Sequence, residues 1–175
     1  SGKAVEALNI GAKLADCWHN TGEGGLSPHH RNGADVIFQF GAGYFGARDM
    51  AGDFSMDLLV RTVSSYRHVR GIELKLSQGS EPGKGGLLPA AKVTDEIAFL
   101  RGVAPGKDCR SPDAHTAFTD IPSLIAFIES IASATGLPVG IKSAVSGAEL
   151  WRALACAMRE RGKGPDWVAI DGGEG

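Results

Sequence analysis

The sequence predicts an α/β fold, with parallel strands and crossover helices of the kind that build a (β/α)8 barrel. Two observations favour this class. Short apolar segments alternate with amphipathic segments of helical period along the 175 residues. Nearly every apolar segment also runs directly into a glycine-rich or polar loop. Because the loops at the carboxyl ends of barrel strands carry the chemistry, we expect the functional residues at these joints.

The first part of the chain contains a predicted helix followed by two predicted strands. Residues 4–15 carry apolar side chains at helical spacing. Residues 17–20 form a short strand, expected to be buried, which delivers Glu23 into a glycine loop. Residues 35–40 form the next strand, which runs into the glycine-rich segment 41–46. Two strand-to-loop joints are therefore expected before the middle of the chain.

The segment GAGYFG at 41–46 formally matches the GxGxxG motif of dinucleotide-binding folds. That motif requires a helix to begin at the glycines. Here residues 48–53 are rich in turn formers, and the next helix starts near Ser55, whose side chain suits an N-cap. The spacing therefore disfavours a Rossmann fold.

The central strand, residues 72–76, alternates apolar with polar side chains, so Lys75 lies on the face opposite the leucines. It enters the loop 77–89, which holds several glycines and two prolines. Such a loop leaves backbone N–H groups free to meet an anionic ligand. A flexible surface turn is the alternative interpretation. We take this joint as the centre of the candidate site.

Helix starts in the second half are marked by capping residues. Thr94 is followed directly by acidic residues, which favour a first helical turn. Asp120 precedes Pro122, a residue suited to the start of a helix. Ser146 and Glu149 have the spacing of a capping box. We therefore expect three helices here.

Two more strands are expected, and one long segment is predicted to be irregular. Residues 138–145 form a strand that carries a second lysine, Lys142. Residues 167–170 form the last strand, which runs into a glycine-rich segment beginning at Asp171. Residues 102–117 show no period and contain glycine and proline. The order of elements gives about five of the eight strands of a barrel.

Composition limits the classes of function. A net charge of −2 argues against a protein built mainly to bind nucleic acid or an anionic membrane, since both need an excess of basic residues. No apolar segment approaches about 18 residues, and the N-terminus lacks the pattern of a signal peptide. The 43% hydrophobic content is ordinary for a globular domain. We expect one domain, or part of one.

The cysteines and histidines form no regular ligand pattern. Three widely spaced cysteines without a CxxC pair fit a reducing compartment, so we expect a cytoplasmic protein. A metal site formed by Cys17, His19, His29 and His30 is an alternative, but it lacks the spacing of a known site. No metal is predicted.

Five motifs in one order resemble the FMN-binding synthase domain of glutamate synthases, over essentially the whole chain. They are NTGEGG at 20–25, FQFGAGYFG at 38–46, KLSQGSEPGKGG at 75–86, PVGIK at 138–142 and IDGGEG at 170–175. The resemblance implies a TIM barrel in which reduced FMN gives a hydride to 2-iminoglutarate, formed from 2-oxoglutarate and ammonia. From the spacing alone, only an anion-binding β/α protein would follow.

The resemblance also implies roles for particular residues. Glu23 and Arg101 match residues near the substrate, and Lys84 is a third candidate for catalysis. A lysine at a strand end can hold the negative charge of reduced flavin at its N1–C2=O edge. The residues expected around the cofactor are Lys75, Gln78, Lys142, Asp171, Gly172 and Gly173.

Two positions depart from the family pattern QGAKPGEGGQLPG. In that pattern a lysine before proline and a glutamine after the glycines bind 2-oxoglutarate, and this chain has Glu81 and Leu87 there. A carboxylate facing a dicarboxylate is repulsive, which puts 2-oxoglutarate itself in question. Lys84 stands where the family often has glutamate. It restores the positive charge if the side chains of Glu81 and Lys84 share one pocket. A solvated ion pair on the loop is the equal alternative.

The resemblance further implies that residues 1–175 are the central part of one FMN-binding barrel domain. The first strand, the last strands, the flavin-phosphate loops and the iron–sulfur cysteines of the family lie outside this segment. Cys17, Cys109 and Cys156 match none of the cluster cysteines, so no iron–sulfur cluster is predicted here. A partial barrel has two free edges, so we expect the isolated segment to form homo-oligomers and to lose FMN.

Three functions follow from these observations. The leading one is a glutamate-synthase-like flavin oxidoreductase that takes a small 2-oxo acid and gives an amino acid. A second is a non-catalytic barrel that serves as a binding or assembly module. A third keeps FMN but uses a different amino-acid-type substrate, and Glu81 and Leu87 are its basis. The sequence names neither the electron donor nor the ammonia source.

Overall fold

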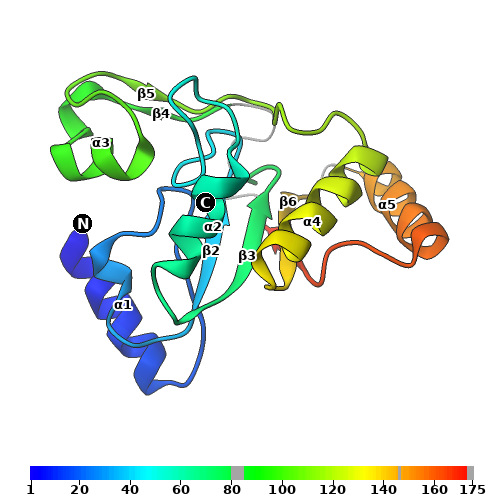
Figure 1. Ribbon diagram of the computed structural model, residues 1–175, viewed down its shortest axis with the longest axis horizontal. Coiled ribbons are helices and arrows are strands. Elements are labelled where there is room, and N and C mark those ends of the chain that lie inside the picture. Colours follow the sequence, from blue (N-terminus) through cyan, green and yellow to red (C-terminus); the bar gives the residue numbers. More distant parts are fainter. Residues whose placement is uncertain (80–84, 146, 173–175) are drawn as a thin grey trace.

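The strands form one curled parallel sheet, seen as a half-barrel in Figure 1. The computed structural model describes residues 1–79, 85–145 and 147–172. The strands of the sheet, in spatial order, are β1 (His19–Asn20), β2 (Val36–Phe40), β3 (Val69–Lys75), β6 (Val139–Ala144) and β7 (Val168–Asp171). This order follows the sequence without reversal, as in a barrel, whereas an open doubly wound sheet reverses its order. The predicted α/β class is confirmed, with the sheet of an incomplete barrel.

α-Helices lie between most successive strands of the sheet, and one face of the sheet is covered by helices. Their bounds are α1 (Gly2–Leu14), α2 (Met56–Ser64), α3 (Asp95–Arg101), α4 (Ile121–Thr135) and α5 (Ala148–Arg161), with short 3-10 helices at Pro28–His30 and Ala90–Lys92. Figure 1 shows α2, α4 and α5 along the outer side of the strands. No helix within the described residues is long and apolar enough to cross a bilayer.

The two faces of the sheet differ, as strand alternation predicts. On the outer face, Ile72 and Leu74 of β3 lie beside Val139 and Ile141 of β6, and all four are fully buried. They pack against the apolar sides of α2 and α4 in one core cluster. The inner face carries the intervening residues, including Lys75. The apolar outer face is therefore the core, and the inner face is left for polar side chains.

Capping explains where most of the helices begin. The side chains of Ser55, Thr94 and Asp120 each accept a hydrogen bond from a backbone N–H one turn into the helix, as predicted. The fifth helix, α5, begins at Ala148. Ser146, the first residue of the predicted capping box, lies outside the described residues.

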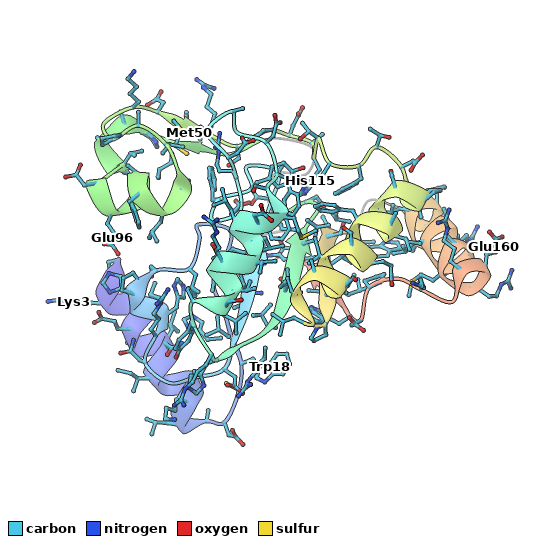
Figure 2. All side chains as sticks on the ribbon, viewed as in Figure 1. Lys3, Trp18, Met50, Glu96, His115 and Glu160 are labelled. Atoms are coloured by element: carbon cyan, nitrogen blue, oxygen red, sulfur yellow. The ribbon has the colours of Figure 1, made fainter. Side chains whose placement is uncertain are left out.

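The strand predicted at 17–20 is present as β1, but the prediction that it is buried was wrong. Strand β1 lies at one edge of the described sheet, and Asn20 and Trp18 are exposed, Trp18 by 52%. Trp18 lies at the end of the sheet opposite His115 (Figure 2). An edge strand has one neighbour, so its side chains are less covered than those of a central strand.

The prediction of an irregular segment at 102–117 was wrong in part. Strand β5 (Cys109–Arg110) pairs antiparallel with β4 (Leu87–Leu88). Together with α3 they form a small separate core that contains Phe45, Val93, Ala98 and Cys109. Strands of two residues are too short to show a period, so no local pattern marks them.

Trp167 covers the inner face of β3 and β6, and two glycines make this possible. A Cβ at Gly71 would lie 2.9 Å from Trp167 Cη2, and a Cβ at Gly140 would overlap the indole ring at Cε2. Both glycines lie in strands, at positions where no side chain fits beneath the ring. Trp167 therefore packs on the inner face of the sheet, on the N-terminal side of Lys75 and Lys142.

We predict that Gly140→Ala destabilises the protein by about 1–3 kcal/mol, because the new methyl group must displace the Trp167 ring. Gly11→Ala in α1 is the matched control. Nothing lies within 4 Å of a Cβ there, so helix propensity should raise stability by about 0.5–1 kcal/mol. Urea unfolding followed by circular dichroism measures both changes. Equal stability of the Gly140→Ala variant and the wild type would contradict this packing.

Candidate functional site

Two lysines lie side by side at the carboxyl edge of the sheet. Lys75 is the last residue of β3, and it is the register partner of Lys142 in β6. Register partners on parallel strands share a face, so both side chains belong to the inner face. The predicted strand positions of these two residues are therefore correct, and they neighbour each other.

Lys75 joins two other predicted site residues. Its Nζ donates to Glu23 Oε1 at 3.0 Å and to Gln78 Oε1 at 2.8 Å, and the lysine side chain is only 12% exposed. Glu23 comes from the loop after β1. Gly41, at the end of β2, leaves the space that the Glu23 carboxylate occupies, since a Cβ there would overlap Oε2. Side chains from the loops after β1 and β3 thus meet at one ammonium group, in space left by Gly41 after β2.

Asp171 joins Lys142 to the loop that follows Lys75. Asp171 Oδ2 lies 3.5 Å from Lys142 Nζ and accepts a hydrogen bond from the Gly79 N–H at 3.0 Å. The Gly79 N–H, and after it the Lys142 charge, hold the pKa of Asp171 below its usual range. Gly172 follows at once and is exposed. The Gly79 N–H of the glycine-rich loop is therefore hydrogen-bonded to an aspartate of this chain.

Arg101 lies beside the Glu23 loop but makes other contacts. Its guanidinium carbon is 4.7 Å from the centroid of the Phe45 ring, and its Nη1 lies 3.7 Å from Cys109 Sγ. A Cβ on Gly24 would be 3.7 Å from Arg101 Nη2. Within the described residues, no hydrogen bond or ion pair joins Arg101 to the Glu23 carboxylate. Arg101 therefore approaches this site through the Glu23 loop.

A small cavity of about 40 Å³ opens beside Lys75. Its walls include Glu23 and Gln78 on one side and Ser111 and Asp113 on the other. Gly85 and Gly86, which follow the undescribed residues of the glycine-rich loop, also line this cavity. Lys142 does not line the cavity.

Three predicted positions lie outside the described residues: Glu81, Lys84 and Gly173. Leu87, the other departure from the family pattern, lies in β4 and is 53% exposed.

The sequence did not single out His115, which lies against Lys75. His115 Nε2 donates to the Lys75 carbonyl oxygen at 2.9 Å, when this nitrogen carries the proton. Burial lowers the pKa of His115, which favours the neutral ring. Its segment had no period or motif to mark it.

Glu73 and Gln39 were also missed, although a signal was present. Glu73 lies two residues before Lys75 on the same strand, so alternation places it on the inner face. Gln39 is its register partner on β2. Both side chains are buried.

The alternative metal site is not assembled by the fold. His19 Nδ1 lies 3.1 Å from Asn9, and His30 Nδ1 lies 2.8 Å from Ser27 Oγ. His29 instead bridges Glu6 at 2.7 Å and Glu96 at 3.0 Å. Burial, and then the neighbouring His19, lower the pKa of His30 to about 4. No group of three metal-binding side chains occurs in the part of the chain that the structure describes.

Comparison with known proteins gives one family. A family model described as the conserved region in glutamate synthase matches residues 1–175. The glutamate synthase large subunit-like protein YerD of Bacillus subtilis (strain 168) is 42% identical over 175 residues, which cover 99% of this chain and 33% of that protein. The archaeal-type glutamate synthase [NADPH] of Thermotoga sp. (strain RQ2) is 34% identical, over 97% of this chain and 30% of its own. The chain spans about a third of the length of these relatives.

Proposed function

This chain belongs to the glutamate synthase family, and on that premise we propose that the protein carrying it is an FMN-dependent oxidoreductase that aminates a 2-oxo acid reductively. The leading substrate is 2-oxoglutarate, and the product is glutamate. One observation carries the proposal. Lys75, held by Glu23 and Gln78, is in register with Lys142 at the carboxyl edge of a parallel sheet, where barrel enzymes keep their active sites.

The residues at this edge suit the charged edge of a flavin ring. Reduced flavin carries negative charge at N1–C2=O, and two neighbouring ammonium groups on one face supply the opposite charge. Lys75, Lys142 and Gln78 would hold this edge of the ring, with Asp171 and Gly172 beside it. FMN bound here, once reduced by an electron donor, would supply the hydride for the reduction.

Glu23 and Arg101 would act on the substrate side. The overall reaction converts a 2-oxo acid and ammonia into a 2-imino acid and water, after which a hydride and a proton give the amino acid. Glu23 fixes the Lys75 ammonium by a charged hydrogen bond, so that the lysine N–H groups keep one direction. Arg101 is the cation best suited to a substrate carboxylate, because its planar guanidinium binds carboxylates in a bidentate manner. Phe45 stacks on the guanidinium and orders it.

One observation favours a different 2-oxo acid as the substrate. Leu87, where the family has glutamine, offers no hydrogen bond and is half exposed on β4. A 2-oxo acid with a less polar or uncharged side chain would lose no hydrogen bond by facing such a residue.

The test is isotopic amination by the full-length protein. We expect reduced enzyme, given 15N-ammonium or amide-15N-glutamine and a panel of 2-oxo acids, to form one 15N-labelled amino acid, identified by mass spectrometry. A protein that retains FMN but labels no amino acid from the panel would contradict the proposed reaction. A protein that binds no flavin would support the binding-module alternative.

A further inference from the structure

Glu73 is the most buried charged residue on the inner face, with 3% of its surface exposed. Its carboxylate accepts hydrogen bonds from three separate parts of the sheet. Oε1 accepts from Asn20 Nδ2 at 2.8 Å and from Gln39 Nε2 at 2.6 Å, and Oε2 accepts from Trp167 Nε1 at 2.9 Å. One side chain of β3 thus ties together β1, β2 and the residue before β7.

The hydrogen bonds continue from Glu73 to the loop that carries Glu23. Asn20 donates to Glu73 through its amide nitrogen, while its amide oxygen accepts from the Gly22 N–H at 2.9 Å. Thr21 lies between Asn20 and Gly22 in the sequence, and its hydroxyl group accepts a hydrogen bond from the Gln39 N–H at 2.9 Å. The turn before Glu23 is therefore fixed by Asn20 and Thr21, and both lead back to Gln39 or Glu73.

We propose that Glu73 is a positioning residue that sets the Glu23 carboxylate against the Lys75 ammonium. Because Glu73 offers only acceptors, Asn20 must turn its NH2 group inward and its oxygen toward Gly22. That orientation holds the start of the loop, and Glu23 then reaches Lys75 at 3.0 Å. The importance of this geometry for catalysis rests on the proposed function, but the geometry itself does not.

An amide at position 73 would break this arrangement for a specific reason. In Glu73→Gln, the side-chain oxygen should face Trp167, because the indole N–H can only donate, whereas the amides of Asn20 and Gln39 can turn over and accept from the new NH2 group. If the NH2 group faces Asn20, the Asn20 amide must turn over and loses its bond to Gly22. Trp167→Phe removes the competing donor, so the glutamine oxygen is free to serve Asn20 and Gln39. The double variant should therefore regain the hydrogen bond between Asn20 and the Gly22 N–H, which Glu73→Gln loses.

The experiment compares Glu73→Gln, Trp167→Phe and the double variant in the full-length protein by hydrogen–deuterium exchange. We expect Glu73→Gln to raise amide exchange about tenfold in a peptide covering residues 20–25, as loss of one hydrogen bond implies, while a peptide from α4 keeps its protection. Trp167→Phe alone should leave the 20–25 peptide protected, because Asn20 and Gln39 use the other carboxylate oxygen. The double variant should regain wild-type protection.

Exchange is measured without substrate, so this result does not depend on the proposed reaction. Unchanged protection of residues 20–25 in Glu73→Gln, or failure of Trp167→Phe to restore it, would overturn the positioning role. In an active enzyme, kcat should fall in Glu73→Gln and recover in the double variant with little change in KM. A purely structural role would lower the melting temperature and leave kcat of the folded enzyme unchanged.

Discussion

In the full-length protein, Lys75→Met is expected to lower kcat for reductive amination by about 100-fold to 1,000-fold, the usual cost of removing one positioned donor from a site of developing negative charge. The substitution removes the cation that faces the proposed flavin edge. It also leaves the Glu23 carboxylate without the ammonium that it meets at 3.0 Å. Flavin content should fall as well, because the remaining carboxylate repels the reduced ring.

Lys163→Met is the matched control for the loss of a lysine. Lys163 pairs with Glu129 at 3.2 Å but is 61% exposed, so its removal should change stability by less than about 1 kcal/mol and leave kcat unaltered. Steady-state rates and the flavin-to-protein ratio measure both variants. If Lys75→Met kept the wild-type kcat and flavin content, the lysine would have no part in the reaction.

Replacing Glu81 with lysine and Leu87 with glutamine together should raise kcat/KM for 2-oxoglutarate by about 10-fold to 100-fold. The change exchanges a carboxylate and an apolar group for two hydrogen-bonding partners, and a charged hydrogen bond is typically worth about 1.5–3 kcal/mol. Leu87 is half exposed, so little packing is lost. The resemblance to the family pattern implies that both positions lie at the substrate, and Glu81 lies outside the described residues.

Leu8→Gln controls for the replacement of an exposed leucine, since Leu8 lies on α1 and is 63% exposed. It should leave kcat/KM unchanged for every 2-oxo acid. If the double variant had the same kcat/KM for 2-oxoglutarate as the wild type, positions 81 and 87 would not contact the substrate. A simultaneous loss of activity on another 2-oxo acid would identify the native substrate class.

Local signals in the sequence predicted most of the sheet and its helices. Alternation placed Lys75 on the face opposite Leu74, and the register of β3 with β6 gives the same result. Ser55, Thr94 and Asp120 cap helices where their side chains indicated, because capping depends only on residues one turn away. These features need no tertiary information.

Contacts between distant segments could not be predicted in this way. Asp171 meets the Gly79 N–H although 92 residues separate them, and Trp167 reaches Glu73 across 94 residues. Strands β4 and β5 pair through only two residues each, which leaves no period to detect. In each case the two partners are brought together only by the tertiary structure, and no spacing along the chain predicts their contact.

We propose that Lys75 and Lys142, the lysine pair at the carboxyl edge of the sheet, belong to a flavin site. The most direct measurement is the absorbance spectrum of the purified full-length protein, with the released cofactor identified by mass spectrometry. We predict one FMN per chain, and a large loss of FMN when Lys75 and Lys142 are both replaced by methionine. A colourless protein that takes up no FMN when the cofactor is supplied would contradict the claim.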